Sequence, residues 1–271
     1  KSDVVDSEIN KEGNLIGFST YKNISRGNPV DDNSEFLTKG NTFGVTAFIN
    51  TEGVTSPYMG ITTEGIEIIS DGTKWTYANT SDQAYWPTKD ETLDFYAYYP
   101  YGNAAITAKT FTTTGLTLNY TVPDEEANQV DLMYAVAKDQ TKPTDKNSVT
   151  LPFKHALTQV HFKVGTKTTN LKVDIAANGI QIHNLKNSGS LTMKSNQIDD
   201  AAWTLTGDAT AKYTVTSDAV TGDYTDGTEA NPYTEIGNAN NALMLLPQEF
   251  VAGDGTAENT GAYLTISCKI Y

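Results

Sequence analysis

Residues 93–99 read Leu-Asp-Phe-Tyr-Ala-Tyr-Tyr (LDFYAYY), a run in which apolar and aromatic side chains recur at every second position. Successive side chains of a β-strand point to opposite faces, so every second residue from Leu93 to Tyr99 shares one face. Tyr96 and Tyr98 point to the other face. The run predicts a strand that places its Leu93 face in a sheet core.

Similar short runs occur along the whole chain, and helical periodicity is almost absent. About twelve to fourteen strands are too many for one small sandwich but fit two sandwiches of about seven strands each. We therefore predict an all-β protein. The runs are residues 15–21, 42–49, 74–78, 93–99, 132–137, 159–164, 171–175, 179–183, 203–205, 213–216, 242–246 and 263–271.

A polar, proline-containing stretch at residues 138–148 (KDQTKPTDKNS) separates the two predicted halves of the chain. Domain boundaries fall in such exposed, polar linkers. The hydrophobic stretch that begins VTLPFKH follows directly. We therefore expect one domain over residues 1–148 and a second over residues 149–271.

The composition excludes several classes of partner. The chain has 271 residues, with 19 basic and 33 acidic side chains, for a formal net charge of −14. Such an acidic protein repels nucleic-acid phosphates and anionic membrane surfaces. No apolar run approaches the length of a membrane span, and the polar start KSDVVDSEINKEG is unlike a signal peptide. We expect any signal to have been removed upstream.

No metal or cofactor is expected from the residues. His155 and His161 would lie about 20 Å apart on one straight strand, too far for one ion. His183 is the third histidine, and all three are expected to be structural or surface residues. The acidic residues Asp223, Asp226 and Glu229 miss the spacing of a calcium loop and are expected to be solvated.

No enzyme signature is present. The chain lacks G-x-S-x-G and any glycine-rich phosphate loop. A glycan-processing enzyme would need carboxylates paired across a cleft, and nothing in the sequence marks such a pair. We therefore expect a protein that is not an enzyme.

Three further residues or pairs have a predicted role. Large aromatics are expected in the core, whereas Tyr96 and Tyr98, on the opposite face of their strand, are candidates for an exposed patch that stacks on sugar rings. Arg26 is the sole arginine and lies in a turn-prone stretch, SRGNP, of the kind that proteases cut. Cys268 is the sole cysteine, which excludes an internal disulfide.

The chain resembles the fimbrillin family, the Mfa-like type V pilins of gut and oral Gram-negative anaerobes. The resemblance rests on the order and spacing of motifs over about residues 15–271. The motifs are WTY at 75–77, YWP at 85–87, LDFYAYYP at 93–100, DLMYA at 131–135, LPFKHALTQVHF at 151–162, GIQIHNL at 179–185, Trp203, LLPQ at 245–248 and YLTISCKIY at 263–271.

The resemblance implies two transthyretin-like β-sandwich domains in tandem. It also implies export as a lipoprotein, with the lipidated cysteine just upstream of Lys1, and display on the outer membrane in surface fimbriae. The implied partners are other fimbrial subunits and an arginine-specific protease. A host glycan or host protein is the expected adhesion target.

The resemblance further implies assembly by donor-strand exchange. A protease cuts after the first strand, and a strand from a neighbouring subunit fills the groove that the lost strand leaves. Carried onto this chain, the removable strand is LIGFSTYKNISR at residues 15–26, and the cut follows Arg26. Ile16, Phe18 and Ile24 share a parity and are expected to contact the core.

Two alternatives remain open. Leu264, Ile266, Cys268 and Ile270 share one face of the final run, so Cys268 is expected in the core. The sequence ends inside this run, so either the chain was shortened or the subunit accepts a strand without donating one and caps one end of a filament. The alternative function is a surface lipoprotein that binds glycans through exposed aromatic residues.

Overall fold

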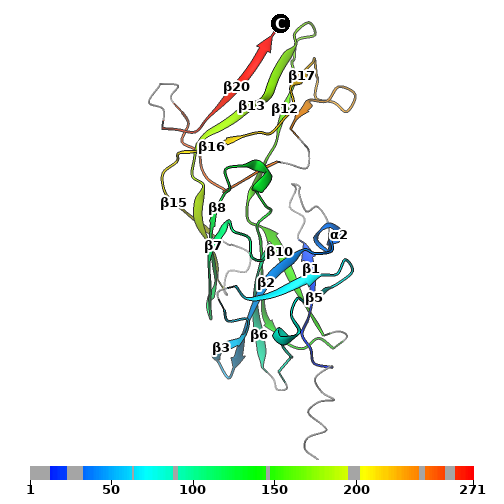
Figure 1. The fold of residues 1–271 in the computed structure, drawn as a ribbon, viewed down its shortest axis with the longest axis vertical. Helices are drawn as coiled ribbons and strands as arrows, with labels where there is room; N and C mark the ends of the chain where they lie inside the picture. The colour runs from blue at the N-terminus through cyan, green and yellow to red at the C-terminus, as the bar shows by residue number, and fades with distance from the viewer. Residues whose placement is uncertain are drawn as a thin grey trace, which may run out of the picture.

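The structure is a computed structural model that describes residues 13–22, 33–62, 64–87, 91–144, 147–194, 202–237, 242–253 and 260–271. The chain is all-β, as predicted, and forms an elongated molecule (Figure 1). The described residues contain one α-helical turn, α2 (Asn33–Phe36), and two short 3-10 helices, η1 (Thr80–Asp82) and η2 (Glu126–Asn128). No described helix is long and apolar enough to cross a membrane.

The first sheet occupies the lower half of Figure 1 and closes on itself. Its strand order is β3-β2-β4-β5-β1-β10-β9-β6, and a further pairing joins β6 to β2. The strands are β1 (Gly17–Lys22), β2 (Thr42–Thr51), β3 (Val54–Met59), β4 (Ile66–Ser70), β5 (Trp75–Tyr77), β6 (Thr92–Tyr99), β9 (Met133–Gln140) and β10 (Ser148–His155). The inward residues form a core of their own that includes Phe18, Phe43, Phe95 and Phe153.

A second sheet lies against the outer face of β6 and β9. Its order is β15-β14-β8-β7, with β7 (Ile106–Thr112), β8 (Gly115–Thr121), β14 (Ser188–Lys194) and β15 (Ala202–Thr206). Leu116 and Leu118 of β8 share a buried cluster with Tyr96 and Tyr98 of β6. The first sheet therefore has buried residues on both of its faces along these strands.

The remaining strands form the upper part of the molecule. A third sheet centres on β13 (Val173–Leu185), with β16 (Ala211–Thr214) and β17 (Val220–Gly222) on one side and β20 (Tyr263–Ile270) also paired to it. Two short pairs complete the fold. They are β11 (Thr158–Val160) with β19 (Leu243–Leu245), and β12 (Phe162–Val164) with β18 (Thr234–Ile236).

The sheets do not divide at residue 148. Strand β10 begins there and pairs with β1 and β9 of the first sheet. Strands β8 and β14 pair across the proposed boundary, in register from Gly115↔Lys194 to Thr121↔Ser188. One buried cluster also runs from Tyr96 through Leu118 to Ile180. The reason is that the second sheet takes strands from both halves of the chain.

Candidate functional site

Strand β1 occupies a slot between β5 and β10 in the closed sheet (Figure 1). It runs parallel to β10 over six residue pairs, from Gly17↔Ser148 to Lys22↔Phe153. Its pairing with β5 is limited to Phe18↔Trp75. The strand is thus attached firmly along one edge and at one point along the other.

Backbone hydrogen bonds fix the chain at the entry to β1. The Ile16 N–H donates to the Ala84 carbonyl (2.9 Å), and the Trp86 N–H donates to the Asn14 carbonyl (2.8 Å). On the other side, the Gly17 N–H donates to the Asn147 carbonyl (2.9 Å). The segment before β1 is therefore held by neighbours that are distant in sequence.

The inward side chains of β1 fill the core of the first sheet. Ile16, just before β1, is fully buried and Phe18 is 5% exposed, and both belong to the buried cluster of the first sheet. The Phe18 ring makes edge contacts with Phe43, Tyr77 and Phe95, with centroids 5.8–6.2 Å apart. Full burial of such side chains is worth about 1.5–3 kcal/mol each, so Ile16 and Phe18 contribute strongly to holding this segment in the sheet.

Three aromatic residues of the WTY and YWP motifs contact β1 or its flank through their polar atoms. The Trp75 indole N–H donates to the Thr20 hydroxyl (3.1 Å), and the Tyr77 hydroxyl donates to the Ile16 carbonyl (3.0 Å). The Trp86 indole N–H donates to the Asn147 carbonyl (2.9 Å). The sequence placed these residues in the core but did not reveal that they hold the strand.

Burial keeps the Tyr77 hydroxyl protonated. Desolvation raises the pKa of Tyr77 well above its ordinary value of about 10. A hydroxyl that stays protonated can donate to Ile16 over the whole physiological pH range. The contact to β1 is therefore insensitive to pH under ordinary conditions.

Two predicted residues of the removable strand lie outside the described residues. They are Ile24, the third expected core contact, and Arg26, the expected cleavage position. The described part of the strand ends at Lys22. Cleavage after Arg26 thus stays a prediction.

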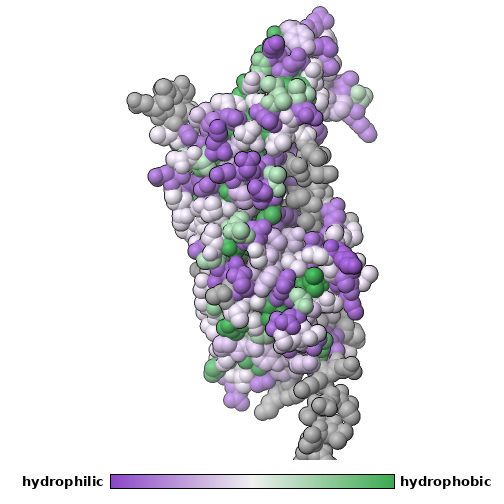
Figure 2. All heavy atoms as spheres, in the orientation of Figure 1, coloured by the Kyte–Doolittle hydropathy of each residue, from purple (hydrophilic) through white to green (hydrophobic). Residues whose placement is uncertain are grey.

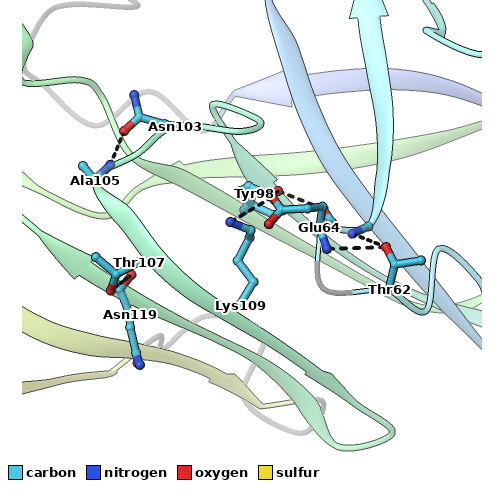
Figure 3. Close-up of polar contacts among 9 residues, drawn as sticks. Thr62, Glu64, Tyr98, Asn103, Ala105, Thr107, Lys109 and Asn119 are labelled. Carbon is cyan, nitrogen blue, oxygen red and sulfur yellow. Dashed lines mark hydrogen bonds and ion pairs between the residues drawn. The ribbon is translucent and has the colours of Figure 1, made fainter.

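The predicted surface patch at Tyr96 and Tyr98 is wrong, because both residues are fully buried. The second sheet covers them: the Tyr98 ring lies 6.4 Å from Phe111 and 5.6 Å from the Lys109 ammonium. Figure 3 shows the Tyr98 hydroxyl and Lys109 converging on Glu64. The hydroxyl donates to the Glu64 carbonyl (2.8 Å), and Lys109 Nζ lies 2.9 Å from Glu64 Oε2.

The expectation for Cys268 is also wrong, because its side chain is exposed. Every residue of β20 is exposed, including Leu264, Ile266 and Ile270 on the same face. Among the described residues, no strand covers this face or pairs with the outer edge of β20.

The histidines and loop carboxylates have separate surroundings. His155 Nδ1 lies 2.8 Å from Asp131 Oδ1 in a largely buried pair, whereas His161 is exposed. The His183 ring stacks on Tyr263, with centroids 4.5 Å apart. The acidic residues Asp223, Asp226 and Glu229 are exposed, and the described residues contain no group of three or more side chains that could hold a metal ion.

The model of the fimbrillin-like family matches residues 29–270. No curated protein matches the sequence. The fold is similar to that of a fimbrial protein from Bacteroides vulgatus, at 18% identity and a TM-score of 0.64, over 95% of this chain and 83% of that one.

A second solved structure, from Bacteroides ovatus, is described as a candidate cell adhesion protein. It is 15% identical, with a TM-score of 0.52, over 93% of this chain and 85% of that one. These structures share the fold. The family match spans most of the sequence, and on that ground the chain belongs to the fimbrillin-like family.

Proposed function

We propose that this protein is a subunit of cell-surface fimbriae and that it assembles by exchange of strand β1. The observation that carries the proposal is the position of β1 between β5 and β10, with six pairs to one neighbour and one to the other. Membership of the fimbrillin-like family supports the fimbrial role.

The mechanism is strand replacement without bond-making in the subunit. Cleavage after Arg26 frees β1 from the rest of the chain, and its loss exposes the edge of β10 and the cavity that Ile16 and Phe18 filled. A strand from another subunit then pairs with the same edge and buries equivalent side chains. The proposal includes an arginine-specific protease, a lipid anchor upstream of Lys1 and a host glycan or protein as the adhesion target.

Glycan binding through Tyr96 and Tyr98 is not proposed further. Both rings are buried beneath the second sheet, so they offer no face on which a sugar could stack.

The test uses the fact that the chain has one arginine. The folded protein is treated with an arginine-specific protease, and the products are measured by intact mass. We expect a single cut after Arg26 and no cut in an Arg26→Ala control. An intact folded chain that resists the protease would overturn the cleavage step.

Exchange is then measured with a labelled peptide of residues 13–26. We expect the peptide to replace the native strand in the cleaved protein and not in the uncleaved one. A peptide with Phe18→Asp is the matched control, because a carboxylate cannot enter the ring cluster of Phe43 and Phe95 without a large desolvation cost. Equal uptake of both peptides would contradict exchange into the β1 slot.

A further inference from the structure

Strand β20 presents an apolar face that continues the buried face of β13. Leu264 is paired with Ile182, Ile266 with Ile180, and Cys268 with Ile175. Paired residues of neighbouring strands lie on the same face of a sheet. The three isoleucines of β13 are 3–9% exposed, whereas Leu264 is 49% and Ile266 54% exposed.

The uncovered face borders an apolar groove of about 550 Å³. Its lining includes Phe162 of β12, Leu245 of β19, Ile182 of β13 and Leu264 of β20. None of the described residues that line the groove is charged. Figure 2 shows apolar side chains among the polar ones at the upper end of the molecule, where Figure 1 draws β13 and β20.

The exposed apolar area is close to what a stable interface buries. Exposure of 38–77% is shared by seven apolar residues at this end of the molecule, which are Phe250, Val251, Tyr263, Leu264, Ile266, Ile270 and Tyr271. Within this group Leu264, Ile266 and Ile270 lie on one face of the strand, and Tyr263 and Tyr271 on the other. At roughly 150–200 Å² for a full side chain of this size, the seven leave about 600–800 Å² uncovered over both faces. A standard interface buries about 800 Å² per partner.

Within the part of the chain that the structure describes, the outer edge of the β20 backbone has no paired strand. The Tyr271 N–H donates to the Lys172 carbonyl (3.1 Å), and the Lys172 N–H donates to the Tyr271 carbonyl (2.8 Å). Backbone groups alternate in direction along an antiparallel strand. The odd-numbered residues of β20 therefore bond to β13, and the N–H and C=O groups of the even-numbered residues face the outer edge.

Charge favours an approach at this strand. The whole chain carries a formal net charge of −14, which opposes contact between two copies over most of the surface. Residues 263–271 contain no acidic side chain and one basic one, Lys269. The strand also lacks proline, so it has few of the features that normally block pairing at a sheet edge.

From these observations we propose that two copies of this chain associate by antiparallel pairing of their β20 strands, about a twofold axis at Ser267. In this register Leu264 lies opposite Ile270 of the second copy, and Ile266 lies opposite Cys268. Tyr263 lies opposite Tyr271, and Lys269 lies opposite Thr265, so no like charges meet. The alternatives centred on Ile266 or Cys268 pair fewer residues of 263–271.

The interface does not depend on the release of β1. The two strands lie in different sheets, so a failure of β1 exchange leaves this proposal intact, and the reverse also holds. The register predicts which single cysteine can form a disulfide across the axis.

The first experiment replaces Cys268 with serine and places one cysteine elsewhere on β20. In Ser267→Cys the two thiols lie on directly opposed residues that do not exchange hydrogen bonds, about 4.5 Å apart at Cα, within the range that a disulfide bridges. We expect a disulfide-linked dimer under mild oxidation. In the control Thr265→Cys the two residues are offset by four positions, about 13 Å along the strand, and no dimer is expected.

The second experiment measures association directly by analytical ultracentrifugation of residues 1–271. We expect a concentration-dependent dimer, weakened at least tenfold by Ile266→Lys, because two ammonium groups would enter an apolar face. Val54→Lys is the matched control, since Val54 is 64% exposed on β3, far from β20. A chain that stays monomeric to about 1 mM, a dimer insensitive to Ile266→Lys, or cross-linking of Thr265→Cys in preference to Ser267→Cys would overturn the proposal.

Discussion

Single polar atoms on aromatic rings determine how β1 is held. Trp75, Tyr77 and Trp86 each place a ring in the core or at its edge and direct one donor to a group on or beside β1. Their rings could be assigned to the core from sequence alone. The hydrogen-bond partners of their N–H and O–H groups could not be predicted. These acceptors lie about 55 to 61 positions away in the chain, and only the fold brings them close.

Tyr77→Phe tests this arrangement at one atom. The substitution keeps the ring and leaves the Ile16 carbonyl without the hydroxyl donor, so we expect the free energy of unfolding to fall by about 1–3 kcal/mol. Urea denaturation measures the change. Tyr224→Phe is the control, because its ring is 40% exposed, and a loss in Tyr77→Phe no larger than in this control would contradict the assignment.

The buried pair of Asp131 and His155 gives a second test. The Asp131 side chain is 3% and the His155 side chain 12% exposed, with 2.8 Å between Oδ1 and Nδ1. Removing one partner leaves the other polar group buried without its hydrogen bond, which costs about 1–3 kcal/mol. We expect that loss for His155→Leu and a partial recovery when Asp131→Leu is added, as measured by a double-mutant cycle. Additive losses would show that the two groups act independently.

At the scale of the element, the pairing of β2 with β6 leaves no room for a side chain on β2 beside Tyr98. Gly44 of β2 is paired with Tyr98 of β6. A Cβ at Gly44 would lie 2.7 Å from Tyr98 Cζ and 2.9 Å from the Glu64 carbonyl oxygen. The ring cannot easily move aside, because its hydroxyl donates to that same carbonyl.

Gly44→Ala is therefore expected to destabilise the protein by about 1–3 kcal/mol or more through overpacking. Thermal or urea unfolding measures the loss. Gly13→Ala is the matched control, since a Cβ at Gly13 meets nothing within 4 Å. Equal stability of the two variants would mean that Tyr98 moves aside at little cost.

The strands that could be predicted and those that could not differ in their composition. Runs such as LDFYAYY carry strong alternation, and the structure contains β6 there. Strands β7, β8 and β14 read ITAKTFT, GLTLNYT and SGSLTMK, in which threonine and serine weaken the apolar signal. These weak strands make up most of the second sheet. Their absence from the prediction explains why Tyr96 and Tyr98 were assigned to the surface.

At the scale of the whole molecule, several buried tyrosines link stability to alkaline pH. Desolvation raises the pKa of Tyr77, Tyr98, Tyr120 and Tyr213 above the ordinary value of about 10. Above pH 10 the unfolded chain binds fewer protons at these groups than the folded one. Their contribution is therefore complete below pH 10 and is lost as the pH rises further.

We accordingly expect the free energy of unfolding to fall steeply between about pH 10 and 12. Urea midpoints measured at several pH values would give the slope of the unfolding free energy against pH. Tyr98→Phe should reduce that slope by the equivalent of about one bound proton. A flat profile to pH 12 in the wild-type protein would contradict the assigned burial.

The strand pairings on either side of residue 148 could not be predicted from the sequence. The polar stretch at residues 138–148 has the composition of a linker, yet it leads directly from β9 into β10 of the same sheet. A polar composition indicates that a segment is exposed. It does not distinguish a connection between two strands of one sheet from a linker between two domains. The pairing of β8 with β14 depends on contacts about 70 residues apart in the chain, which no local pattern records.

The parallel ladder between β1 and β10 has a mechanical consequence. Tension applied along β1 would load its six pairs in shear, so that they must fail together. A competing strand that enters from one end would instead displace the pairs one after another, each at a small barrier. The same ladder would therefore resist a pull along the strand far better than it would resist a competing strand that enters from one end.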